Sequence, residues 1–207
     1  MPSGEHESPL ELIHEDPDLI VWILKDLLGV KVPEFTEARP HTTEVRELVQ
    51  RTYHADGVVT LHDNDGNAVY GAVVEVQRSR EKGKLRTWKQ YLAALEAKIC
   101  TPVALVVVCS QRLAAWYSFQ IGMDSGSLQL IPHWVTPEDV PMPRYPHEAR
   151  SEPAGAVLGT LLHAGEPGID DAFPALAAAI HNLKPEKALL YYDVVLAGLP
   201  KEAGGRW

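Results

Sequence analysis

Two β-rich runs decide how this chain folds: Asp56-Gly-Val-Val-Thr-Leu61 and Val69-Tyr-Gly-Ala-Val-Val-Glu-Val-Gln77. Val, Thr and Tyr are enriched in strands, and the polar cluster Asp63-Asn-Asp-Gly-Asn67 separates the two runs. Within this cluster, Asp65-Gly66 is a preferred dipeptide for a tight two-residue turn. The pattern therefore predicts a β-hairpin over these residues.

A two-residue turn also fixes which residues of the hairpin face each other. In that register Asp56 lies opposite Glu75, and His54 lies opposite Gln77. Two directly opposed carboxylates have Cβ atoms roughly 4.5–5.5 Å apart and repel each other when both are charged. A divalent cation between them removes the repulsion, whereas a bulge in either strand would shift the register and separate the pair. Outside a metal site, acidic residues near strand ends are ordinarily just solvated.

A helix and a buried strand are predicted to follow the hairpin. From about Leu85 to Ile99, apolar residues recur at three- and four-residue spacing, and Pro102 blocks any extension of this helix. Residues 103–109 are an apolar run without alternation, which is typical of a strand covered on both faces. Strand, helix and strand together predict a βαβ unit with a right-handed crossover.

Further elements are predicted on both sides of this unit. Asp16 and Pro17 suit the start of a helix over residues 17–28. Residues 45–53 are compatible with either a short helix or a strand. Edge strands are expected around 116–121 and 128–133, and the spacing of apolar residues predicts tail helices at about 154–163, 171–183 and 186–197.

Length and composition favour one main domain. With 207 residues, of which 45% are hydrophobic, the chain can bury a sizeable core. We expect an α/β core over residues 1–135, a Pro-rich connection over 136–153 and a helical extension over 154–207 packed on the core.

Charge and targeting signals restrict the function classes. A net charge of −9 argues against a protein that coats nucleic acid generally, so any such contact must be local. The first ten residues lack the features of a secretory signal, and no apolar run is long enough to span a bilayer. A soluble cytoplasmic protein is therefore expected, with Cys100 and Cys109 as reduced core residues.

Several catalytic motifs are absent from the sequence. It contains no HExxH zinc motif, no phosphate-binding Gly-x-x-x-x-Gly-Lys-Ser/Thr loop and no Gly-x-Ser-x-Gly elbow. The sequence therefore gives no support for a zinc-dependent hydrolase of that type, for a P-loop nucleotide-binding protein or for a hydrolase with a serine nucleophile.

Asp56, the hairpin, Val-Val-Glu75-Val-Gln77 and the following amphipathic helix resemble the PD-(D/E)XK nuclease superfamily. The Glu-x-Gln form of the motif is similar to its recombination-promoting nuclease or putative-transposase branch. The resemblance is best over residues 45–110. It implies a restriction-endonuclease-like core, a mixed central sheet flanked by helices in the order αβββαβ, followed here by the helical extension.

The resemblance also implies roles for the hairpin residues. Asp56 and Glu75 would bind Mg²⁺ or Mn²⁺, the backbone carbonyl of Val76 could add an oxygen ligand, and Gln77 would orient the attacking water. A lysine at position 77 would add positive charge at the site, whereas glutamine offers only hydrogen bonds. This departure weakens the expectation of catalysis.

Accessory positions are suggested by the same resemblance. Glu44 or Glu47 could add a carboxylate from the first core helix. Arg86 and Tyr91 could face the site from the following helix, although an aromatic residue there is more often part of the core and an arginine more often solvated.

A basic segment follows the proposed site directly. It contains one acid, Glu81, and six basic residues: Arg78, Arg80, Lys82, Lys84, Arg86 and Lys89. These could hold DNA phosphates, or they could form a solvated loop and helix start. Trp88 could stack on a base, but its spacing favours the core.

Two functions therefore stand as hypotheses. The first is a metal-dependent endonuclease-like phosphodiesterase that acts on DNA. The second is a nuclease fold without catalysis, used as a nucleic-acid-binding or protein-interaction module. A homodimer formed through the helical tail is a weaker third hypothesis.

Overall fold

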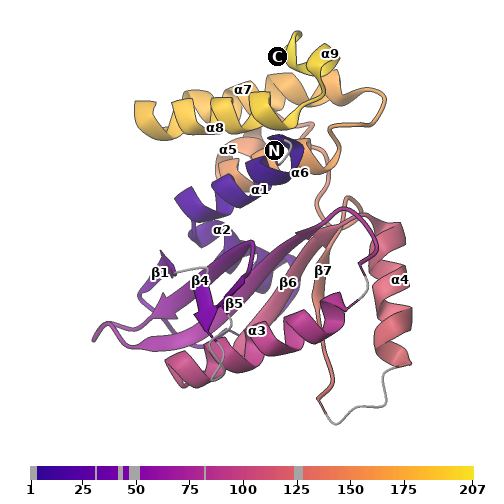
Figure 1. Ribbon diagram of the computed structural model, residues 1–207. Coiled ribbons are helices and arrows are strands. Elements are labelled where there is room, and N and C mark those ends of the chain that lie inside the picture. Colours follow the sequence, from indigo (N-terminus) through magenta and orange to yellow (C-terminus); the bar gives the residue numbers. More distant parts are fainter. Residues whose placement is uncertain (1–3, 31, 42–43, 47–51, 82, 124–127) are drawn as a thin grey trace. The chain divides into compact units, whose positions relative to one another are not determined.

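The computed structural model describes residues 4–30, 32–41, 44–46, 52–81, 83–123 and 128–207. These residues form two compact units. We call residues 20–136 the sheet unit, and residues 1–19 together with 137–207 the helical unit. Figure 1 shows the strands and helices of each.

A mixed five-stranded sheet forms the centre of the sheet unit. Its strands follow the order β1 (Glu37–Pro40), β4 (Gly57–His62), β5 (Ala68–Gln77), β6 (Val103–Cys109) and β7 (His133–Val135). The pairs β1–β4 and β4–β5 are antiparallel, and β5–β6 and β6–β7 are parallel. Helices α3 (Lys84–Ile99) and α4 (Gln111–Gly122) connect the parallel strands. The predicted fold class, a mixed sheet flanked by helices, is confirmed.

The predicted hairpin register is confirmed over the body of β4 and β5. Gly57 pairs with Val74 and Leu61 pairs with Tyr70, as a two-residue turn would require. The turn itself was predicted wrongly, because Asp63 and Asn67 are joined by a backbone hydrogen bond of 3.0 Å around a three-residue loop. A bulge between Leu61 and His62 then compensates for the extra loop residue.

The loop is built from residues suited to it. Gly66 has a φ of 81°, a left-handed conformation that a side chain disfavours. The Oδ1 atom of Asp63 accepts hydrogen bonds from the backbone N–H of Asp65 at 3.0 Å and of Asn67 at 2.8 Å. A type I turn followed by a left-handed glycine is a common three-residue hairpin connection.

The helix and strand after the hairpin are confirmed as α3 and β6, within one residue of the predicted bounds. The strand expected at 116–121 is wrong, because these residues belong to α4. Ser110 caps this helix and accepts from the Leu113 N–H at 3.4 Å, while Ala114 and Tyr117 face the core at helical spacing. The strand expected around 128–133 is displaced: residues 128–132 form no strand, and pairing with β6 begins at His133, in β7.

Near the start of the chain, one predicted helix is divided and the ambiguous segment forms strands. The helix expected over 17–28 is divided into α2 (Asp18–Trp22) and a π-helix, η1 (Ile23–Leu27). The ambiguous segment contributes β2 (Glu44–Arg46) and β3 (Thr52–His54), which form a separate antiparallel pair. Its residues 47–51 lie outside the described part of the chain.

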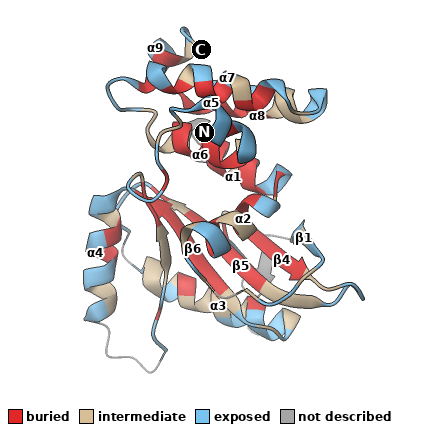
Figure 2. Ribbon diagram, turned by 180° about the vertical axis from the view of Figure 1, so that it is seen from behind, coloured by how far each residue is buried: buried red, intermediate tan, exposed pale blue. Residues whose placement is uncertain are grey.

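Aromatic side chains fill the space between the sheet, α3 and α4. The Trp88 ring lies 5.0 Å from Tyr117 and 6.3 Å from Trp134, measured between centroids. Trp88, Tyr91 and Leu95 form the buried face of α3. Figure 2 shows the buried strands β4, β5 and β6 from the opposite side. Trp88 is therefore a core residue.

The helical unit combines α1 (Gly4–Glu15), which was not predicted, with the tail helices. The expected tail helices are confirmed as α6 (Pro153–Leu162), α7 (Phe173–His181) and α8 (Pro185–Gly198). Three further short helices accompany them: α5 (Pro146–Ser151), η2 (Ile169–Ala172) and α9 (Lys201–Gly204). The expected division placed α1 with the core, whereas it groups with these helices; the packing of the tail on the core stays a prediction.

Two general expectations can be compared with the structure. Cys109 is buried, but Cys100 is exposed, so its assignment to the core was wrong. Among the described residues, no helix is both long and apolar enough to cross a bilayer.

Candidate active site

Asp56 and Glu75 come together at the end of the β4–β5 hairpin. Ladder pairing ends at Gly57 and Val74, and the next residue on one side is Asp56 and on the other Glu75. The carboxylate of Asp56 turns to the neighbouring backbone, where its Oδ2 accepts a hydrogen bond of 2.9 Å from the Val76 N–H. The contact replaces the next rung of the ladder and holds Asp56 beside β5.

Glu75 is a fully buried acid, with an exposed fraction of 0%. Burial raises its pKa, the Lys84 ammonium opposes this rise, and the negative charge of Asp56 adds to it. Because a buried charge without compensation is costly, a second cation would stabilise the ionised form. The two carboxylates thus form a site that favours positive charge.

Lys84 provides one positive charge at this site. Its Nζ lies 2.7 Å from Glu75 Oε2, and its side chain is only 17% exposed. Desolvation is the largest single influence and lowers the pKa of Lys84, but the charge and hydrogen bond of Glu75, together with the charges of Asp56 and Glu81, outweigh it, so the net shift is upward. The sequence-based interpretation of Lys84 as one of several phosphate-binding residues missed this contact.

A lysine close to Glu75 could in principle have been found from the sequence. Lys84 is the first residue of α3, and the polar connection after β5 is short enough to bring it back to the strand end. The hairpin pattern alone contains no signal for the direction of its side chain, which depends on how α3 starts after Gly83.

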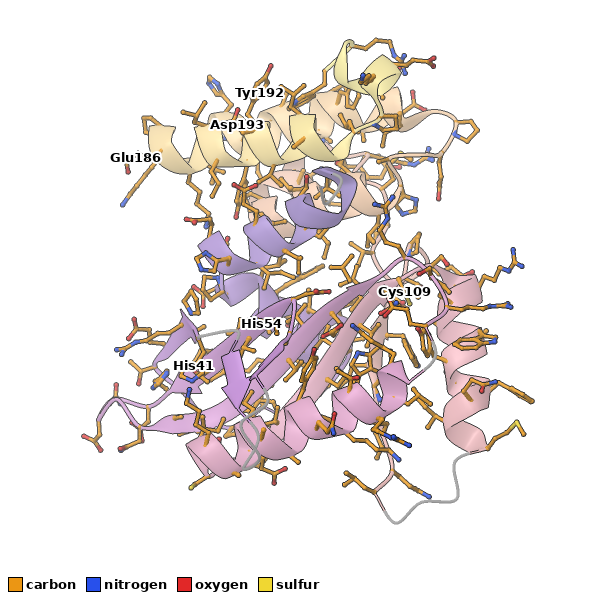
Figure 3. The ribbon with its side chains drawn as sticks, in the orientation of Figure 1. His41, His54, Cys109, Glu186, Tyr192 and Asp193 are labelled. Carbon is orange, nitrogen blue, oxygen red and sulfur yellow. The ribbon has the colours of Figure 1, made fainter. Side chains whose placement is uncertain are left out.

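Gln77 lies on the same strand as Glu75 and is also buried, at 3% exposure. Its Nε2 donates to the Ser79 carbonyl at 2.9 Å and to Glu81 Oε1 at 2.7 Å. Both contacts fix the amide and leave its carbonyl oxygen as an acceptor. The expected pairing of Gln77 with His54 is not formed, because the β4–β5 ladder ends at Gly57 and Val74 and His54 pairs with Glu44 on β2. On its other side Gln77 pairs with Cys109 on β6; Figure 3 labels both His54 and Cys109.

The donor set suits a hard divalent cation. Glu75 Oε1 is buried without a hydrogen bond of normal geometry from the described residues, although the Trp88 indole lies close enough to lower the pKa of Glu75; a bound cation would satisfy this oxygen. The N–H and C=O of a strand residue point to the same side, so the Val76 carbonyl points toward Asp56 as its N–H does. No cluster of three or more His, Cys, Asp or Glu side chains occurs in the described part of the chain. Two carboxylates and a carbonyl fit Mg²⁺ or Mn²⁺, which retain water ligands.

The four suggested accessory residues have different environments in the structure, and two of their side chains are not described. Glu44 lies on β2, where its Cα pairs with His54, but its side chain and Glu47 fall outside the described residues. Tyr91 is buried and donates its hydroxyl hydrogen bond to the His54 carbonyl at 2.7 Å. This contact assigns Tyr91 to the scaffold around the site. Arg86 is exposed on α3.

The remaining basic residues that the structure describes lie at the surface. Arg78 and Arg80 are exposed, Lys89 is partly exposed, and Lys82 lies outside the described residues. The Arg80 guanidinium lies 5.3 Å from the centroid of the Trp116 ring on α4. The Tyr117 hydroxyl donates to the Ser79 carbonyl at 3.3 Å and accepts from the Glu81 N–H at 3.0 Å. Both contacts fasten this basic segment to α4.

No protein-family model and no curated protein sequence matches the chain. Among solved structures, it is similar to the crystal structure of the small subunit of a heterodimeric restriction endonuclease. The TM-score is 0.30 and the identity 13%, over 84% of this chain and 98% of that chain. A likeness at this TM-score assigns no residue and no activity, so the candidate site rests on its own geometry.

Proposed function

We propose that the sheet unit is a metal-dependent phosphodiesterase that hydrolyses the DNA backbone as an endonuclease. The observation that carries the proposal is the buried Glu75 carboxylate, which lies beside Asp56 and 2.7 Å from the Lys84 ammonium. Buried acids with a shifted pKa and a specific charged partner are typical of catalytic sites. The resemblance of Asp56, Glu75 and Gln77 to the PD-(D/E)XK motif supports the same reaction.

Each residue has a role that follows from its contacts. Asp56, Glu75 and the Val76 carbonyl would hold Mg²⁺ or Mn²⁺, which supplies a polarised phosphoryl oxygen and a water of lowered pKa. The carbonyl oxygen of Gln77, whose amide nitrogen is already engaged, would accept a hydrogen bond from the attacking water. The Lys84 ammonium would stabilise negative charge that develops on the phosphate.

The basic segment supports a polyanionic substrate. Arg78, Arg80 and Lys89 follow the site in sequence, although the chain as a whole carries a net charge of −9. A local positive surface on an acidic protein directs phosphates to one place and limits contact elsewhere. DNA bound there would pass next to Glu75.

The proposal is tested by nicking of supercoiled DNA. Purified protein with Mg²⁺ or Mn²⁺ is expected to convert supercoiled plasmid to open circles, and EDTA to stop the reaction. Asp56→Asn removes a ligand charge but keeps an acceptor for the Val76 N–H, so it is expected to fold and to lose cleavage. Asp65→Asn, in the exposed hairpin loop, is the matched control and should cleave like the parent.

The opposite results have distinct meanings. Cleavage that persists in Asp56→Asn and Glu75→Ala would contradict the site. Absence of cleavage with either metal, in protein that still binds DNA, would favour the nuclease fold without catalysis.

A further inference from the structure

A hollow lies between α3 and α4, next to the basic segment. Its volume is about 820 Å³, within the range of about 300–1,000 Å³ usual for ligand pockets. We call it the α3–α4 hollow. Its lining residues come from the basic segment and the two helices: Glu81, Gly83, Leu85, Arg86, Lys89, Trp116, Tyr117 and Gln120.

The hollow and the candidate active site share a wall. Glu81 lines the hollow and accepts the 2.7 Å hydrogen bond from Gln77. Gly83 also lines it and directly precedes Lys84, whose ammonium contacts Glu75. A chain that passed through the site would therefore meet the hollow within a short distance.

The lining combines flat apolar surface with positive charge. Trp116 is partly exposed, makes an edge contact with Tyr117 at 4.7 Å and lies under the Arg80 guanidinium at 5.3 Å. Arg86 and Lys89 add two positive charges against the one negative charge of Glu81. Aromatic rings that stack bases, next to cations that hold phosphates, are the combination that binds unpaired nucleotides.

We propose that the α3–α4 hollow binds an unpaired DNA nucleotide next to the bond to be cut, with its base on Trp116 and its phosphates at Arg86 and Lys89. The inference rests on the proposed function for its substrate and extends it, since it assigns a preference for single-stranded or locally opened DNA. A duplex keeps the faces of its bases stacked inside and exposes only base edges and backbone, so it cannot stack a base on the Trp116 ring.

Binding in EDTA separates this inference from cleavage. The probe is a short fluorescein-labelled DNA single strand, followed by fluorescence anisotropy. Trp116→Ala is expected to raise its dissociation constant about 5- to 150-fold, the effect of losing one base stack. Trp116→Phe keeps a stacking face and should recover most of the affinity. Phe119→Ala removes an exposed aromatic of the same helix, 64% exposed and outside the hollow, and should change nothing.

A second pair of variants tests the phosphate contacts. Arg86→Gln is expected to weaken binding and to reduce the salt dependence by about one phosphate contact. Lys98→Gln, an exposed lysine on the same helix, is the matched control. A duplex of the same sequence should be insensitive to Trp116→Ala.

Four outcomes would overturn the inference. These are no single-strand binding by the parent, equal losses in Trp116→Ala and Phe119→Ala, equal sensitivity of the duplex, and competition by polyglutamate as strong as by unlabelled DNA. The last would indicate a site for acidic peptides. Trp116-dependent binding without any cleavage would reject the proposed function and keep the inference, whereas cleavage without Trp116 dependence would do the reverse.

Discussion

The ammonium group of Lys84 lies next to the Glu75 carboxylate. Position 77, on the same strand as Glu75, is a glutamine and carries no charge. The pattern of the hairpin predicted a site of two carboxylates with no positive side chain. In the structure, the first residue of α3 supplies that charge, while Gln77 is tied to Ser79 and Glu81. Under the proposed function, Lys84 would supply the positive charge that a glutamine at position 77 does not.

Lys84→Gln tests that role. Loss of one group that stabilises charge in a transition state costs about 10²- to 10³-fold in rate, and we expect this loss in the plasmid-nicking rate. Removal of one partner of a buried ion pair also lowers the free energy of unfolding, by about 3 kcal/mol.

A double variant separates the two effects. Lys84→Gln combined with Glu75→Gln removes both charges and should restore the urea midpoint without restoring cleavage. Lys98→Gln should change neither measurement. A nicking rate for Lys84→Gln equal to that of the parent would remove Lys84 from the mechanism.

At the scale of elements, local sequence patterns correctly predicted the helices and strands whose apolar residues have a clear periodic spacing or form an unbroken run. The hairpin body, α3 and β6 follow from apolar spacing, and the register survived a wrong turn because the bulge at Leu61 and His62 restored it. The predicted register correctly placed Asp56 and Glu75 at the same end of the hairpin. It did not predict the hydrogen bond from the Val76 N–H that holds the Asp56 carboxylate there. Residues 116–121 were predicted wrongly as a strand because their aromatic side chains favour strands. They form part of a helix because Ser110 caps its start and its buried residues recur at helical spacing. The hollow depends on α4, so it was invisible from the sequence.

Asp63 gives the hairpin a testable pH dependence. Hydrogen bonds from the Asn67 backbone, more than any other cause, lower the pKa of Asp63 from its ordinary 3.8. A lowered pKa means that the native state binds fewer protons, so this stabilisation is complete above 3.8 and disappears as the pH falls through the lower native value.

Asp63→Asn cannot ionise, so it should lose this dependence. We expect the difference in urea midpoint between parent and variant to shrink as the pH falls from 5 through 3.8. Asp65→Asn, which leaves Asp63 in place, should keep the pH dependence that Asp63 provides. A difference that stays constant with pH would mean that the loop does not depend on the Asp63 charge.

At the scale of the molecule, distant parts of the sequence build the helical unit. The Tyr191 hydroxyl donates to Asp16, and the Lys187 ammonium lies 2.6 Å from the same carboxylate. Burial, followed by the bond to Asp16, raises the pKa of Tyr191. This cluster ties residues near the start of the chain to α8. No local pattern predicted it, because the partners are 175 positions apart.

Tyr191→Phe tests this cluster. The ring stays packed while a buried hydrogen bond to a charged group is lost, so the free energy of unfolding should fall by about 2 kcal/mol. Urea unfolding followed by circular dichroism measures it. Tyr192→Phe, one residue further along α8 and 41% exposed, should have no effect. Equal stability of the parent and Tyr191→Phe would contradict the assignment.

The division of the chain also sets an order during synthesis on the ribosome. Residues 20–136 are continuous, whereas α1 packs against α6 and α8, which are made much later. Translation of residues 137–207 takes about 4 to 14 s at usual rates. Until α6 and α8 have both been made, the apolar side chains of Leu12 and Ile13, buried in the folded helical unit, lack the full set of their partner helices. The nascent chain therefore exposes an apolar segment that its partner helices cover only later.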